Sequence, residues 1–303
     1  MKRYFLLLAI SLIPLFVMSQ FGGVGSFLPK GYETLDTTAF RVFYEFNYPP
    51  ALKTVKRLAS ESVEDSLKQE KSADYMVLEL GTTGISKFYS DYKRMLDSMI
   101  MDVLNNVTQQ KIAQFQETLQ NSNVKKYDER EIFKNYPEGK MTVTDQAAIN
   151  SFTYTEELNE IQWQITSDTL TCLNYLCQKA TCDFRGRRYE AWFAPEIPVN
   201  DGPWKFSGLP GLILYVKDST EKYVIKAVGI EYANVPLKFA QKDYIKTNRK
   251  EVDKIKKRYA EDPLGYTMSS FPGVQIPESV PDGKGGMVSR EDLKMIYNPM
   301  ELE

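Results

Sequence analysis

Apolar and aromatic residues recur along the chain in short alternating runs that are typical of β-strands. The first run, Phe40–Tyr48, is rich in aromatic residues and stops at Pro49-Pro50, and a second, Tyr75–Leu80, stops at Gly81. Further runs with turn residues between them follow: Met141–Val143, Phe152–Tyr154, Ile161–Ile165, Leu170–Cys177, Tyr189–Ala194, Leu212–Val216 and Tyr223–Glu231. Short strands at this spacing predict an antiparallel meander.

Two segments have helical periodicity instead. After Ser86, the expected N-cap, apolar residues recur at steps of four and three, namely at Phe88, Tyr92, Leu96, Met99 and Val103. The segment Leu237–Tyr259 has an apolar face, a basic opposite face and Pro236 near its first turn. The sequence therefore predicts an α+β fold, in which two main helices pack on one curved antiparallel sheet.

The first 19 residues have the order of a secretory signal peptide, with two basic residues, the apolar stretch Tyr4–Val17 and then Ser19. This stretch is shorter than the roughly 20 residues that a membrane-spanning helix needs. We therefore expect cleavage after Ser19 and an exported chain in the periplasm or cell envelope, with an uncleaved anchor as the alternative. The expected organisation is a signal peptide at 1–19, a flexible lead-in at 20–35, a single domain at 36–262 and a Pro- and Gly-rich extended tail at 263–303.

Composition narrows the chemistry that the chain can perform. Its 38 basic and 40 acidic residues nearly cancel, so the net charge gives no reason to expect a nucleic acid partner. The chain contains no histidine, which excludes Ser-His-Asp and Cys-His nucleophiles and every zinc site that includes histidine. We expect neither a cofactor nor a metal site.

Three cysteines, Cys172, Cys177 and Cys182, follow one another at five-residue intervals. An odd number in an exported chain suggests one disulfide and one free thiol, with the pairing open. On one straight strand the first two would point to opposite faces, so a bridge needs a bend, which Asn174 allows because it tolerates positive φ. One alternative is that all three are small buried side chains. A reactive thiol is the last alternative, because no histidine is available to activate it.

The run Phe184–Leu214 combines aromatic, charged and turn-forming residues at high density. Within it, Pro210 and Gly211 fit the two central positions of a type II turn. Gly208, just before this turn, would let another segment approach closely. The stretch Ala194–Pro198 should be extended, because residues that precede proline are driven out of the helical region.

This run resembles the GLPGLI family of the Bacteroidota, a secreted family of unknown function named for Gly208–Ile213. Further family motifs are found at Cys177–Thr181, Phe184–Arg187, Ala191–Phe193, Pro195–Pro198, Gly202–Phe206 and Asn298–Leu302. The resemblance implies export to an envelope rich in outer-membrane receptors, and it offers no catalytic residue to transfer. The chain departs from the family pattern at Cys172, Asn174 and Cys182.

Residues of this run that turn geometry does not explain predict a binding surface, made of Arg185, Arg187, Trp192, Phe193, Glu196, Trp204, Lys205 and Phe206. Aromatic rings would supply apolar area and charges would orient the partner. The partner would be a lipid or other apolar ligand in the concavity of the sheet, as in the open barrel of periplasmic lipoprotein carriers that this fold resembles, or an outer-membrane protein. For each aromatic side chain, ordinary core packing is the alternative.

Two other functions stay open. Glu190, Glu196 and Asp201 could form the carboxylate pair of a hydrolase that works without histidine. Against this, Glu190 could pair across the sheet with Arg188 or Lys217, and Asp201 could close its own turn. A structural role in the envelope is the third function.

Overall fold

The computed structural model describes residues 29–48, 72–121, 127–158, 160–270, 275–281, 286–295, 297 and 299–302. The predicted signal peptide and most of the predicted lead-in lie outside these residues. Within them, no helix has both the length and the apolar character that crossing a membrane requires.

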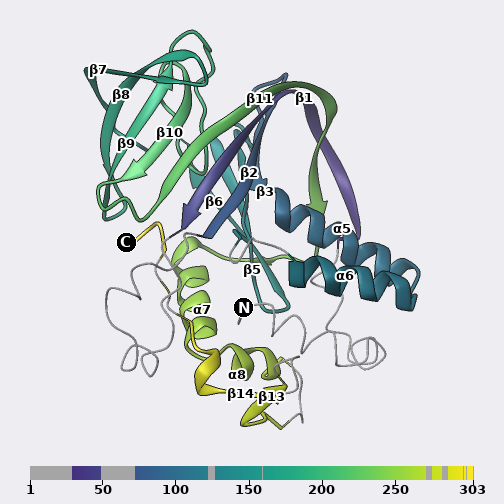
Figure 1. The fold of residues 1–303 in the computed structure, drawn as a ribbon. Helices are drawn as coiled ribbons and strands as arrows, with labels where there is room; N and C mark the ends of the chain where they lie inside the picture. The colour runs from purple at the N-terminus through teal and green to yellow at the C-terminus, as the bar shows by residue number, and fades with distance from the viewer. Residues whose placement is uncertain are drawn as a thin grey trace.

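A single curved sheet of twelve strands forms the body of the protein (Figure 1). Its strands lie in the order β12-β6-β5-β4-β3-β2-β1-β11-β10-β9-β8-β7, and every neighbouring pair is antiparallel except β12 and β6. The strands are β1 Gly31–Tyr48, β2 Ser72–Gly81, β3 Ser86–Ser90, β4 Glu131–Lys134, β5 Lys140–Ala147, β6 Asn150–Glu157, β7 Gln164–Cys172, β8 Tyr175–Phe184, β9 Arg187–Ala194, β10 Leu212–Asp218, β11 Val224–Gln241 and β12 Ile245–Lys246. The sheet does not close on itself, which confirms the predicted open-sheet α+β fold.

The helices lie at two places along the sheet (Figure 1). Helix α5 packs on β2, β3 and α6, and helix α7 packs on β5 and α8. A small hairpin, β13 and β14, and a short 3₁₀ helix follow. The bounds of these elements are α5 Asp91–Asn105, α6 Gln109–Asn121, α7 Arg249–Glu261, α8 Pro263–Met268, β13 Ser279–Pro281, β14 Met287–Ser289 and η1 Glu291–Leu293. The segment expected to be an extended tail thus contains regular structure.

Both predicted helices begin later than expected. Residues 86–90 form β3, and α5 starts after Ser90, whose hydroxyl accepts a hydrogen bond from the Lys93 N–H at 3.1 Å. Likewise Leu237 belongs to β11, and α7 starts after its cap Asn248. In both cases pairing with a neighbouring strand outweighs local helical periodicity, because β3 pairs with β2 and β11 pairs with β1 as far as Gln241.

The same long pairing moves the start of β1. The strand begins at Gly31, opposite Gln241, inside the segment expected to be a flexible lead-in. Conversely, the run predicted as one strand, Leu170–Cys177, is divided between β7 and β8. The turn between them has positive φ at Leu173 and Asn174, 47° and 67°, so the predicted bend at Asn174 is confirmed.

One face of the sheet carries the main core. Side chains of β1 alternate, and Val42, Tyr44 and Phe46 are fully buried on this face. The core continues through β9 and β10 to the loop between them, where Trp204 and Phe206 are also fully buried. The opposite face of the first strands carries many charged side chains, and it forms the wall of the cavity described below.

Candidate functional site

Four of the eight predicted binding residues lie in the interior. Phe193, Trp204 and Phe206 are fully buried, and Lys205 is 1% exposed. The Trp204 ring packs against the ring of Phe206, with centroids 5.0 Å apart, and also against Phe184 and Tyr189. Core packing, the alternative stated for these aromatic residues, is therefore what the structure shows, and these four side chains do not form a surface.

The remaining candidates differ from one another. Trp192 is half-buried, with the Lys179 ammonium 5.7 Å from its ring centroid, and Glu196 is exposed. Arg185 and Arg187 are half-buried and both are engaged by other parts of the chain. The eight residues therefore do not converge on one exposed site.

The turn residues of this segment also act differently from the prediction. Gly211 has φ of 157° and donates its N–H to the Leu209 carbonyl at 2.9 Å, so Pro210 is the centre of a three-residue turn instead of part of a type II turn. A Cβ at Gly211 would lie 2.3 Å from the Ala194 carbonyl oxygen, so Gly211 is the residue required for close approach. Gly208 instead supplies a positive φ of 94°.

A buried lysine that the sequence analysis did not identify fixes the loop between β9 and β10. The Lys134 ammonium, from β4, bonds to the Asp201 carboxylate and donates to the carbonyl oxygens of Gly202 at 2.6 Å and Phe206 at 3.0 Å. Burial lowers the pKa of Lys134, and the charge of Asp201 opposes this effect. Lys134 thus holds the middle of the loop, residues 201–206, to β4.

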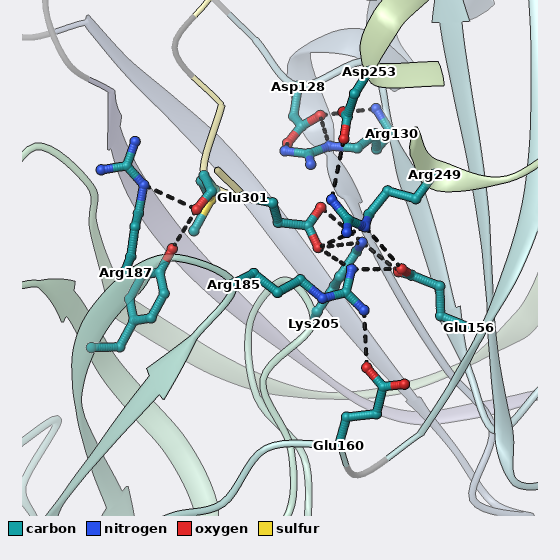
Figure 2. A network of polar contacts seen from close by, with 12 residues as sticks. Asp128, Arg130, Glu156, Glu160, Arg185, Arg187, Lys205, Arg249, Asp253 and Glu301 are labelled. Carbon is teal, nitrogen blue, oxygen red and sulfur yellow. Dashed lines mark hydrogen bonds and ion pairs between the residues drawn. The ribbon is translucent and has the colours of Figure 1, made fainter. Parts of the chain in front are cut away.

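Charged side chains from distant parts of the chain form a second buried cluster, drawn in Figure 2. The Lys205 ammonium contacts the carboxylates of Glu156 at 2.5 Å and Glu301 at 2.9 Å, and the Arg185 guanidinium contacts the same two carboxylates at 2.6 and 2.5 Å. Burial tends to raise the pKa of Glu301, but Lys205 and Arg185 outweigh it and hold this pKa below its ordinary value.

Besides the Glu301 ion pairs, hydrogen bonds to main-chain carbonyl oxygens attach residues 299–302 to the sheet. Arg187 donates to the carbonyl oxygens of Pro299 at 2.8 Å and Met300 at 3.0 Å, and the Tyr189 hydroxyl also donates to the Met300 carbonyl at 2.8 Å. The Met300 side chain is 2% exposed within the main core. Three predicted binding residues, Arg185, Arg187 and Lys205, therefore bind a segment of the chain itself, and 299–302 is a packed strap instead of an extended tail.

The carboxylates considered for a hydrolase have other partners. Asp201 accepts a hydrogen bond from the Gly202 N–H at 2.6 Å, which closes its turn as expected, and it also pairs with Lys134. Glu190 pairs with Lys179 at 3.5 Å, not with Arg188 or Lys217 as expected. Nothing in these contacts leaves two of the three carboxylates as a free pair, since Asp201 is 7% exposed and Glu196 lies at the surface.

A cavity of about 680 Å³ lies on the other face of the sheet, between α5, the first strands and the end of β11. Its lining is unusually charged. Six basic side chains line it, namely Arg41, Lys87, Lys93, Arg94, Lys238 and Lys242. Six acidic side chains line it as well, namely Glu79, Asp91, Asp97, Glu129, Glu131 and Asp145. Three tyrosines, Tyr32, Tyr89 and Tyr244, and the apolar side chains of Phe43, Val77 and Ile100 complete most of the wall.

Strand alternation explains how these charges reach one space. Arg41 and Glu79 face each other across β1 and β2, and their side chains pair at 2.9 Å, while Tyr89 of β3 donates to the same Glu79 carboxylate at 3.1 Å. On the next strands Lys87 pairs with Glu131 at 3.1 Å. On each strand the residues adjacent to these charged side chains, such as Leu78 next to Glu79, point into the core on the opposite face of the sheet.

Burial and neighbouring charges shift the pKa values of two lysines that line the cavity. Burial acts to lower the pKa of Lys93, but Asp97, at 2.5 Å, and Glu129 outweigh it and raise this pKa. Burial, followed by the like charge of Lys93, lowers the pKa of Lys242. Among the residues with described positions, no group of three or more Cys, Asp or Glu side chains is arranged to hold a metal ion. The cavity therefore offers paired charges of both signs.

Sequence reasoning did not find this cavity. The signal was present as charges that alternate with apolar residues in the strands, for example Arg41 between Phe40 and Val42 and Lys87 before Phe88. Alternation shows that a strand has a polar face, but it does not show which polar faces meet. The convergence depends on strand order and on the position of α5, which are properties of the folded chain.

Comparisons with known proteins give a short sequence match and a weak structural one. Residues 184–215 match the model of a domain described as a protein of unknown function, Porph_ging. No curated protein sequence matches the chain. Two crystal structures of PNGF-II, in space groups C2 and P2₁, resemble 72% of the chain with TM-scores of 0.45 and 0.44 and sequence identities of 11% and 10%. The chain spans about one third of the length of those structures, 32% and 33%.

Proposed function

We propose that this chain is an exported binding protein of the GLPGLI type, and that its ligand is a polar small molecule held in the charged cavity. The observation that carries this proposal is a space of about 680 Å³ whose wall contains six basic and six acidic side chains. Ligand sites in proteins commonly have volumes of about 300 to 1,000 Å³ and a few convergent polar groups. Export is proposed from the leading basic and apolar residues of the sequence.

The chemistry of the wall favours a particular kind of ligand. Because the basic and acidic side chains are equal in number, a strongly charged ligand of either sign would gain little net attraction. A neutral or zwitterionic polar molecule would instead exchange hydrogen bonds with ion pairs such as Lys87–Glu131. The exposed ring of Tyr32 offers an apolar face for the less polar part of such a molecule.

The same observations argue for moving the ligand site away from the run Phe184–Leu214. The aromatic side chains of that run fill the core, and three of its basic side chains hold residues 299–302. We therefore propose that this run supports the fold and that the cavity near α5 binds the ligand. A polar ligand replaces the apolar one expected from the sequence, because the lining of the cavity is charged.

The test is to identify what the protein carries and where. Protein purified from its native envelope would be examined by native mass spectrometry, and any released compound would be added back to ligand-free protein. At a concentration of 100 times the dissociation constant, binding should stabilise the protein by about 2.7 kcal/mol, which a thermal unfolding assay detects. The proposal expects a polar compound; recovery of lipid alone, or of no compound, would refute it.

Two tryptophan substitutions on α5 locate the site. Ile100 lines the cavity, whereas the adjacent Met99 lines a separate hollow between α5 and α6. Ile100→Trp should fill part of the cavity and weaken binding at least tenfold, and Met99→Trp should bind as the unmodified chain does. Equal binding by both variants would place the ligand elsewhere.

A further inference from the structure

Two of the three cysteines lie together at the tip of the β7–β8 hairpin. Cys172 is the last residue of β7, and Cys177 is the third residue of β8. In the strand register Cys172 is opposite Tyr175 and Leu170 is opposite Cys177, so the two cysteines are diagonal neighbours on one face of the hairpin. The two-residue turn at Leu173-Asn174 brings them there.

The two thiols are neighbours on this face of the hairpin. The Cys177 thiol donates a hydrogen bond to the Tyr175 carbonyl oxygen at 3.6 Å. Cys177 is fully buried, whereas Cys172 is 7% exposed and adjoins the turn, whose Asn174 side chain is at the surface. Cys172 is thus the sulfur that a molecule in solution reaches first.

Cys182 is too far away to take part. It lies five residues beyond Cys177 along the same strand, opposite Tyr189 of β9. Five residues of a strand span about 16 Å, and a disulfide needs Cα atoms within about 7 Å. The strand geometry therefore separates one neighbouring pair of thiols, Cys172 and Cys177, from the distant Cys182.

We propose that Cys172 and Cys177 form a redox-active dithiol, which a glutathione-type or protein disulfide oxidises to an intramolecular disulfide while Cys182 stays reduced. The Cys172 thiolate attacks one sulfur of the oxidant, the oxidant's S–S bond breaks, and one thiolate leaves. Cys177 then loses its proton and attacks the Cys172 sulfur of the mixed disulfide, and the second thiolate leaves. Two protein thiols are oxidised, the oxidant disulfide is reduced, and the two cysteine protons end on the two released thiols.

The electrostatic surroundings agree with this order of events. The neighbouring Cys177 side chain, with a smaller contribution from Lys226, lowers the pKa of Cys172 to about 7, although burial opposes the change. The neighbouring Cys172 side chain and burial raise the pKa of Cys177. Burial raises the pKa of Cys182 to about 12. Since the thiolate is the nucleophile, Cys172 attacks and Cys177 resolves.

The experiment titrates the chain with mixtures of reduced and oxidised glutathione. After acid quenching and alkylation of the remaining thiols in denaturant, intact mass and peptide mapping report which cysteines are linked. The expected result is a Cys172–Cys177 disulfide with Cys182 alkylated. In a second measurement on the folded reduced chain at pH 7, iodoacetamide should modify Cys172 at least tenfold faster than Cys182.

Serine variants separate the roles of the three thiols. Cys182→Ser should oxidise as the unmodified chain does, and Cys177→Ser should stop at a mixed disulfide between Cys172 and glutathione. A disulfide that includes Cys182, the absence of any disulfide at every glutathione ratio, or equal alkylation rates for Cys172 and Cys182 would overturn the proposal. The rate and mapping measurements use the unmodified chain, so they decide even if a serine variant fails to fold.

Discussion

Replacing Lys134 by methionine tests whether the buried contacts of this side chain hold the β9–β10 loop. The substitution keeps the length and apolar stem of the side chain but removes the ammonium that bonds to Asp201 and to the carbonyl oxygens of Gly202 and Phe206. It leaves the Asp201 carboxylate buried, with the Gly202 N–H as a remaining donor. Removing one partner from a buried ion pair costs about 3 to 5 kcal/mol.

The assay is urea unfolding followed by tryptophan fluorescence, because Trp204 is fully buried in the same loop. Lys134→Met and Asp201→Asn should each lower the free energy of unfolding by about 3 kcal/mol or more, since each leaves a buried partner unmatched. The double variant should lose much less than the sum of the two single losses, because it leaves neither charge alone. A loss of about 3 kcal/mol would lower the unfolding temperature by roughly 6 to 12 °C.

A matched substitution controls for the loss of a lysine as such. Lys140 lies in the neighbouring strand and pairs with Glu157 at 3.5 Å on the surface, with both side chains about half exposed or more. Lys140→Met should cost less than about 1 kcal/mol, because solvent screens an exposed pair. A loss below 1 kcal/mol for Lys134→Met, or additive losses in the double variant, would contradict the role given to Lys134.

Three further substitutions test other features. Burial raises the pKa of Asp74 from 3.8 to about 7. Ionising this carboxyl therefore costs the folded chain stability once the pH exceeds about 4, and the full cost, up to roughly 4 kcal/mol, is reached above pH 7. The stability of Asp74→Asn relative to the unmodified chain should therefore increase between pH 5 and pH 8 in urea unfolding, and a relative stability that does not change with pH would contradict this. Gly211→Ala should lower the free energy of unfolding by about 2 kcal/mol or more in the same assay, because its Cβ would meet the backbone of β9. Gly139→Ala, also at positive φ but with open space around it, should lower it by only about 1 kcal/mol, and equal losses for the two variants would refute the close approach at Gly211. Glu301→Gln should lower the unfolding temperature by several degrees, because it removes a buried carboxylate from its ion pairs. Glu160→Gln should lower it only slightly, because the Glu160 side chain is 45% exposed, and equally small effects for both variants would show that the buried cluster adds no stability.

The sheet could be predicted from the sequence because strand alternation is a local property. Most predicted strands, including Tyr75–Leu80 and Tyr189–Ala194, lie within or largely overlap an observed strand. Helix starts could not be predicted as well, because Ser86 and Leu237 have helical neighbours in sequence but strand partners in space. Local periodicity does not contain the energy of that distant pairing.

The candidate site also depends on contacts between residues that are far apart in the sequence, which local sequence patterns do not reveal. Lysine is almost never fully buried unless it is paired, so the sequence favoured a surface position for Lys205. Its partners, Glu156 and Glu301, are 49 and 96 residues away, and nothing in the sequence marks them as partners. The cavity near α5 depends in the same way on several strands whose order only the folded chain reveals.

The strap at 299–302 also sets an order of events during synthesis. Glu301 is 96 residues from Lys205 and 116 from Arg185, so these two cations lack this carboxylate until the ribosome has reached residue 301. Before that moment Lys205 has one carboxylate partner, Glu156, instead of two, so the buried cluster is incomplete. The core should therefore reach its full stability only after synthesis has passed residue 301.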